Sequence, residues 1–211
     1  METLPLETIA NTWIKKAIED LYTEFIIGSI FPSSSPFYFF RALEKILKTY
    51  IICENYDQLS HTNRDKSKLV IDSIARQHGH HIKKMALNLL EKGIIEDSTM
   101  NNEYYFCSEI KISGIEILSI LEKSYLESHY PVPKMIYKDY PSLKYKKIYH
   151  DVSLSSTIDH FTYKLSAELI TKIEEKFNIA ISKNKISTAI NDDDWLRFYR
   201  LFYKKYFNNQ N

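Results

Sequence analysis

Apolar side chains recur every three to four residues along most of the chain, which is the period of an α-helix. The pattern runs through residues 6–31, 37–53, 69–90 and 113–126. In the first of these stretches the apolar positions are Ile9, Trp13, Ala17, Leu21 and Phe25. Polar or proline-containing segments separate the stretches, so the pattern predicts several helices packed together through their apolar faces.

Glycine and proline mark the breaks between these helices. The chain has only 4 glycines and 6 prolines, too few for a meander of short strands. Gly79 should interrupt the helix of residues 69–90, and Gly93 should end it, because glycine accepts the left-handed backbone that closes a helix. Residues 94–108 are predicted to be irregular, although the EYYF sequence within them could pair briefly as a strand.

The last third of the chain adds two predicted helices, at residues 157–177 and 192–207. The second begins with three aspartates and ends with lysines, as the helix dipole favours. Its aromatic residues fall on one stripe, which favours a core or dimer helix over an RNA-stacking surface. The basic and aromatic run at residues 137–150 is the better nucleic-acid patch, with a solvated loop as the alternative. The predicted fold class is all-α.

Composition excludes some classes of protein. Hydrophobic residues make up 44% of the chain and charged residues 26%, as in a globular protein with a real core. The net charge of +1 provides no overall attraction to nucleic acid or lipid. Two cysteines, Cys53 and Cys107, are too few for a disulfide framework, and Cys53 should be a buried, reduced thiol. With neither a signal peptide nor a membrane span in the pattern, we expect a cytoplasmic protein with no membrane partner.

Three sequence elements follow one another in a recognisable order: FRALEKILKTYII at residues 40–52, HGHHIKKM at 78–85 and LEKSYLESHYPVP at 121–133. Together they resemble the HEPN superfamily of helical domains, over about residues 9–133. The matching positions are Glu44, Lys45, Leu47 and Lys48; Gly79, His80 and Ile82; and Tyr130 and Pro131. Two positions depart from the family pattern, because His81 replaces its usual aspartate and His129 its usual arginine.

The resemblance implies a HEPN-like bundle of four to five helices, placed at residues 1–140, and the remaining residues 141–211 should form a helical C-terminal extension packed on it. The superfamily includes metal-independent ribonucleases, nucleotide-binding partners of nucleotidyltransferases, and members without known activity. We therefore expect a protein that binds a nucleotide, RNA or a partner protein without a cofactor. A homodimer and a separate nucleotidyltransferase or antitoxin chain are the partners that the resemblance implies.

Catalysis is the alternative interpretation. The ribonuclease branch carries an arginine followed after four to six residues by a histidine, and Arg76 and His81 have this spacing. A histidine can take the proton of a ribose 2′-hydroxyl while an arginine stabilises the developing phosphorane. Both side chains must then reach a common cleft. In the non-catalytic alternative, Arg76 ends one helix while His80 and His81 begin the next.

The remaining predicted site residues are binding residues: His78, His80, His129, Tyr130 and Lys48. His78 and His81 could share a helix face, but zinc needs about four ligands and no partner motif follows, so no metal site is predicted. His80 is also open to a plain capping or packing role at the helix start.

Overall fold

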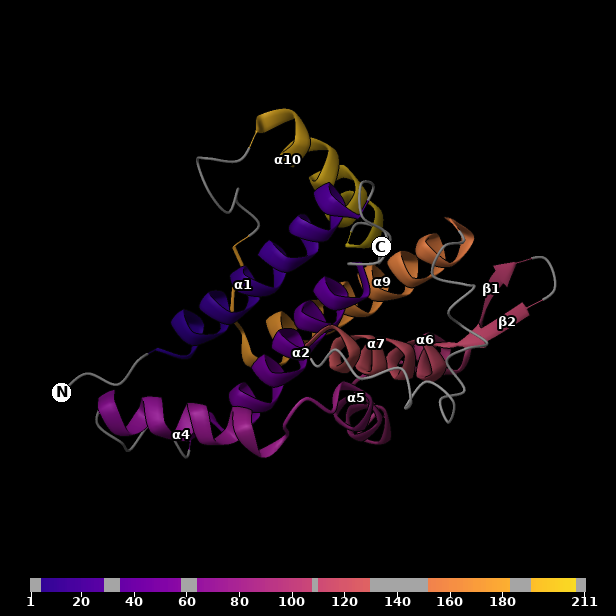
Figure 1. Ribbon diagram of the computed structural model, residues 1–211. Coiled ribbons are helices and arrows are strands. Elements are labelled where there is room, and N and C mark those ends of the chain that lie inside the picture. The colour runs from indigo at the N-terminus through magenta and orange to yellow at the C-terminus, as the bar shows by residue number, and fades with distance from the viewer. Residues whose placement is uncertain are drawn as a thin grey trace.

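The computed structural model describes residues 5–28, 35–57, 64–107, 110–129, 152–182 and 191–207. This part of the chain is mostly helical, which confirms the all-α prediction (Figure 1). The helices are α1 (Leu6–Ile27), α2 (Ser35–Glu54), α4 (Arg64–Gln77), α5 (Ile82–Glu91), α6 (Asp97–Asn101), α7 (Gly114–His129), α9 (Val152–Phe177) and α10 (Asp192–Tyr199), which continues into the π-helical turn η3 (Arg200–Lys204). The strands β1 (Glu103–Cys107) and β2 (Ile110–Ser113) form a small antiparallel hairpin.

Helix α2 lies at the centre of the bundle. It packs against α1, α4, α5, α7 and α9, and Figure 1 shows it crossing the middle of the molecule. Leu43, Ile46, Leu47 and Tyr50 of this helix are fully buried. A helix that is apolar on more than one face must be covered on more than one side, which explains its central position.

The predicted breaks around α5 are confirmed. Gly79 and Gly93 both adopt left-handed backbone conformations, with φ of 55° and 67°. At the end of α5 the N–H of Gly93 donates to the Leu90 carbonyl, and the N–H of Ile94 donates to the Leu89 carbonyl, both at 2.9 Å. These two bonds form a Schellman motif, which closes the helix and turns the chain toward α6.

The segment between α5 and α7 is more regular than the sequence indicates. Residues predicted to be irregular form the short helix α6, while the brief EYYF strand is confirmed as part of β1. Helix α7 starts as predicted, because Ser113 and Glu116 form a capping box: the Ser113 N–H donates to Glu116 Oε2 at 2.7 Å, and the Glu116 N–H donates to Ser113 Oγ at 3.2 Å.

The C-terminal helices share one hydrophobic core with the helices before them. Helix α9 packs against α2 and α7, and α10 packs against α1. Phe198 and Phe202 are fully buried, so the aromatic stripe is a core face, as its spacing predicts. The Asn191 side chain accepts the backbone N–H of Asp193 at 2.8 Å and caps the start of α10. The predicted boundary near residue 140 and the basic run at 137–150 lie outside the described residues.

Two further features bear on the chemistry that the chain can perform. Among the described residues, no helix has the length and apolar character needed to span a membrane. The Cys53 thiol is buried as predicted, and burial raises its pKa to about 12. A thiol with so high a pKa stays protonated near neutral pH and is a poor nucleophile.

Candidate functional site

The histidine-rich segment forms the turn between α4 and α5. Arg76 is exposed in the last turn of α4, and His81 immediately precedes α5. The left-handed backbone of Gly79 breaks the helix between them. His81 makes no side-chain capping bond to α5. Arg76 and His81 therefore belong to the ends of two different helices.

Glu44 joins this turn to α2. Its Oε1 atom accepts a hydrogen bond from Lys48 Nζ at 2.6 Å and lies 2.9 Å from His80 Nδ1. The Glu44 and Lys48 side chains are only 12% and 10% exposed, whereas His80 is 55% exposed. The structure thus brings together Lys48 and His80, which the sequence analysis selected separately. With Nδ1 held by Glu44, the Nε2 atom of His80 is the ring nitrogen available to a ligand.

Aromatic contacts hold the His80 ring against α7. The ring centroid of His80 lies 5.0 Å from that of Tyr125 and 6.4 Å from that of Phe40. Phe40 and Tyr125 are stacked, with centroids 4.1 Å apart. Also from α7, Glu122 accepts the backbone N–H of Lys83 at 2.8 Å, in the first turn of α5. The turn is therefore fastened to two helices, and His80 is held in one orientation.

Positive charge gathers around the first histidine of the turn. Burial lowers the pKa of His78, and the charges of Lys48 and Lys84 lower it further. These effects favour the neutral form of His78, and two lysines lie close enough to act on it. Lys48 is paired with Glu44 at 2.6 Å, so the exposed Lys84 is the lysine here that can attract an anion such as phosphate.

Two basic residues of α2, Lys45 and Arg41, are paired with a buried carboxylate. Asp20 of α1 is buried and forms ion pairs with Lys45 and with Arg41, whose Nη2 lies 3.5 Å from Asp20 Oδ1. Both lysines of the motif are therefore paired: Lys45 with Asp20, which joins α1 to α2, and Lys48 with Glu44. Glu44 is the residue of the motif that contacts the histidine turn.

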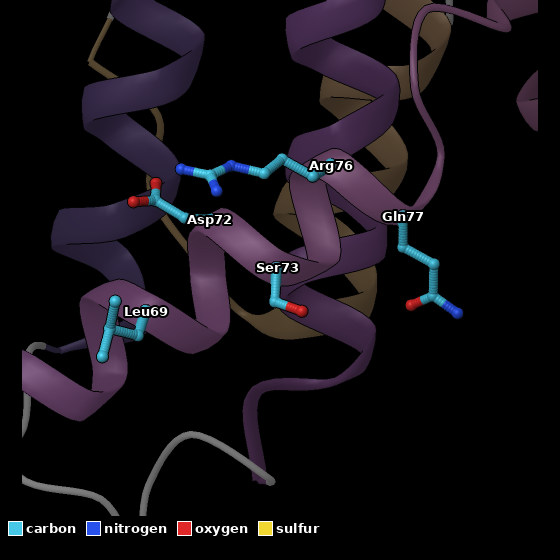
Figure 2. A pocket seen from close by; sticks show the side chains of 5 residues that line it. All are labelled: Leu69, Asp72, Ser73, Arg76 and Gln77. Atoms are coloured by element: carbon cyan, nitrogen blue, oxygen red, sulfur yellow. The ribbon is translucent and has the colours of Figure 1, made fainter.

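Arg76 lies in an open pocket on α4 with a volume of about 400 Å³. Figure 2 shows that Arg76 and Asp72 extend from one side of α4, whereas Gln77 extends from the other. The lining residues are Leu69, Asp72, Ser73, Arg76 and Gln77. No histidine belongs to the lining among the residues that the structure describes, so this pocket does not unite Arg76 with His81. A joint catalytic role for the two stays a prediction.

Three residues of the site were not selected from the sequence. The side chains of two residues that were selected lie outside the described part of the chain. Glu44 matched the motif without being selected as a site residue, and neither Glu122 nor Tyr125 was selected. His129 is the last residue of α7 and Tyr130 follows it; the His129 side chain and all of Tyr130 are outside the described residues. In the described part of the chain, no group of three or more histidine, cysteine or carboxylate side chains is arranged to hold a metal ion.

Known proteins offer no match from which a role for these residues could be taken. No family model, no curated protein and no solved structure matches this chain.

Proposed function

We propose that this protein is a HEPN-like helical bundle that binds a phosphate-bearing ligand, either a nucleotide or RNA, at the turn between α4 and α5. The observation that carries the proposal is the Glu44 bridge, which links Lys48 to His80 at 2.6 Å and 2.9 Å. It places an oriented, exposed histidine beside His78 and the lysines that act on it. Phosphate oxygens would accept hydrogen bonds from the exposed ammonium group of Lys84 and from His80 Nε2–H in the doubly protonated form of the ring, because a neutral ring that donates from Nδ1 to Glu44 has no proton on Nε2.

Calorimetric titration tests this proposal with ATP and with a short single-stranded RNA as separate probes. We expect His80→Gln and Lys84→Ala each to weaken binding about tenfold, because a hydrogen bond to a charged group contributes on the order of 1.5 kcal/mol or more. Lys15→Ala is the matched control, since Lys15 is exposed on α1, which supplies no side chain to the proposed site. Unchanged affinity of His80→Gln for both probes, or no binding of either, would contradict the proposal.

The second candidate function is a metal-independent endoribonuclease of a toxin or defence type. Its support is that Arg76 and His81 are both exposed and that Arg76 lines an open pocket. In this case the purified protein cleaves RNA in the presence of EDTA, and expression slows cell growth. Arg76→Ala and His81→Ala should each remove both effects, because the first withdraws the phosphorane charge partner and the second the proton acceptor. Clear cleavage of RNA by the purified protein would contradict the proposal that it binds its ligand without catalysis.

The partners belong to the same proposal. A homodimer, and a separate nucleotidyltransferase or antitoxin chain, follow from the resemblance rather than from the described contacts, and a cytoplasmic location follows from the sequence pattern. Light scattering at micromolar concentration measures the mass directly, and a monomer would exclude the homodimer.

A further inference from the structure

Helix α10 and the turn η3 bury one face in the bundle and leave the opposite face in solvent. Phe198 is fully buried, whereas Asp193, Leu196 and Arg200 are exposed. Each residue of an α-helix advances about 100°, so these three exposed residues fall within about 60° of one another. Lys204 of η3 is exposed as well. We call the four exposed residues the outer stripe: Asp193, Leu196, Arg200 and Lys204.

The outer stripe carries an apolar side chain between its charged ones. Among the described residues, Leu196 and Leu69 are the large apolar side chains that remain exposed, at 45% and 68%. Leu69 lines the pocket on α4, whereas Leu196 belongs to α10, which packs on α1 and which Figure 1 shows at an edge of the bundle. Contacts between proteins have an apolar centre and a polar rim, and the outer stripe has this arrangement on a small scale.

The charges of the outer stripe have opposite signs at its two ends. Asp193 lies at the start of α10, and Arg200 and Lys204 lie beyond Leu196. None of these three charged residues forms an ion pair with another residue that the structure describes. A polyanion such as RNA would be attracted to one end of the stripe and repelled by the other. The pattern fits a partner that carries the same charges in reverse order.

We propose that the outer stripe is a contact between two copies of this chain, packed antiparallel about a two-fold axis beside Leu196. In such a contact residue i of one copy meets residue j of the other, and j meets i. Asp193 and Arg200 each lie about 5 Å along the helix from the midpoint between them, which is beside Leu196. Asp193 of each copy therefore faces Arg200 of the other, and the two Leu196 side chains meet between these ion pairs. This inference rests on the homodimer of the proposed function, to which it gives a surface, and not on the ligand site.

The width of the contact predicts its strength. A stripe one helix wide is smaller than the interface of a permanent dimer, so we expect monomers and dimers in exchange. Their average mass should rise with protein concentration through the micromolar range, and light scattering measures it. High salt should lower this mass, because salt screens ion pairs that are near solvent.

Charge reversal tests the pairing of the two copies. Asp193→Arg and Arg200→Asp each place like charges opposite one another, so either variant alone should stay monomeric over the whole concentration range. An equimolar mixture of the two variants should associate again, because opposite charges then face each other at both ends of the contact. Leu196→Ala should also lower the average mass, since it removes the apolar centre without changing any charge.

The matched control is Lys15→Glu, a charge reversal at an exposed position of α1, which should associate like the unmodified protein. Circular dichroism of each variant measures whether its helices are retained.

The remaining outcomes overturn the inference. A dimer whose mass is unchanged in both charge-reversal variants uses another face, which leaves the homodimer of the proposed function intact. A mixture of the two variants that stays monomeric shows that Asp193 and Arg200 do not face each other. An unmodified protein that is monomeric throughout the range excludes the contact and the homodimer together. If Arg200→Asp then weakens binding to heparin, the outer stripe binds a polyanion instead of a second copy.

Discussion

At the scale of single residues, Glu168 shows how one buried carboxylate joins two elements. Its Oε1 accepts the backbone N–H of Glu96 at 2.5 Å, and its Oε2 accepts the hydroxyl of Thr99 at 2.7 Å. Thr99 is fully buried, and Glu96 immediately precedes α6. Glu168 therefore joins α9 to the start of α6 by accepting from one buried donor, the Thr99 hydroxyl, and from the part-buried N–H of Glu96.

Glu168→Ala should lower the free energy of unfolding by about 2 to 3 kcal/mol, because it removes two hydrogen bonds and leaves the buried Thr99 hydroxyl without this acceptor. Urea denaturation measures the loss. Glu175→Ala is the matched control on the same helix: its carboxylate is 62% exposed and pairs with Lys172 at 3.5 Å. The control should change stability by less than about 0.5 kcal/mol. Equal losses in the two variants would show that the Glu168 bonds are not stabilising.

At the scale of elements, two glycines are required for different reasons. Gly93 closes α5 with φ of 67°, and a Cβ at this position would meet nothing within 4 Å. Gly114 begins α7 in tight packing, where a Cβ would lie 2.5 Å from Phe161 Cε2 and 2.7 Å from the Thr99 carbonyl oxygen. The first glycine relieves backbone strain, and the second allows α7 to approach α9 and α6.

Gly93→Ala should therefore cost about 1 kcal/mol, the strain of a left-handed alanine. Gly114→Ala should cost more, about 3 kcal/mol, because the backbone carbonyl of Thr99 cannot move aside without shifting α6. Thermal unfolding of both variants gives the comparison. The interpretation fails if Gly114→Ala is the milder change, since backbone overlap would then be absent.

At the scale of the whole molecule, the C-terminal helix is part of the bundle core. Phe198 of α10 contacts Tyr22 and Phe25 of α1, with ring centroids 5.6 Å and 5.8 Å apart, and Tyr163 of α9 at 6.5 Å. Three helices from opposite ends of the chain thus meet at one aromatic side chain. Their unfolding should be cooperative.

Phe198→Ala should destabilise the whole protein by about 3 to 5 kcal/mol, the usual cost of removing a buried phenylalanine. Leu196→Ala is the control from the same helix, because Leu196 is 45% exposed and should change stability by less than about 0.5 kcal/mol. Urea unfolding is followed both by circular dichroism and by Trp195 fluorescence, in a Trp13→Phe background because the chain has 2 tryptophans. If the two signals separate in that background without Phe198→Ala, the C-terminal helix unfolds on its own and the shared core does not hold it.

Local features of the chain are determined by the sequence itself. Helical periodicity predicted most of the helices, because an amphipathic helix encodes its buried face in its own residues. The breaks at Gly79 and Gly93 and the start of α7 at Ser113 were predictable for the same reason, since backbone preference and capping act within a few residues. The short helix α6 was missed because its five residues carry too little periodic pattern to be seen.

Only the tertiary structure decided which side chains meet. Glu44 and His80 are 36 residues apart, and Glu24 and Tyr163 are 139 residues apart. Periodicity identifies a buried face without saying which helix covers it, so neither pair could be predicted. The histidines of the turn make the same point: His78 lies beside lysines, His80 binds Glu44, and His81 only precedes α5. The three histidines differ in their chemistry because the packing of the helices places different side chains beside each of them. That packing depends on the whole bundle.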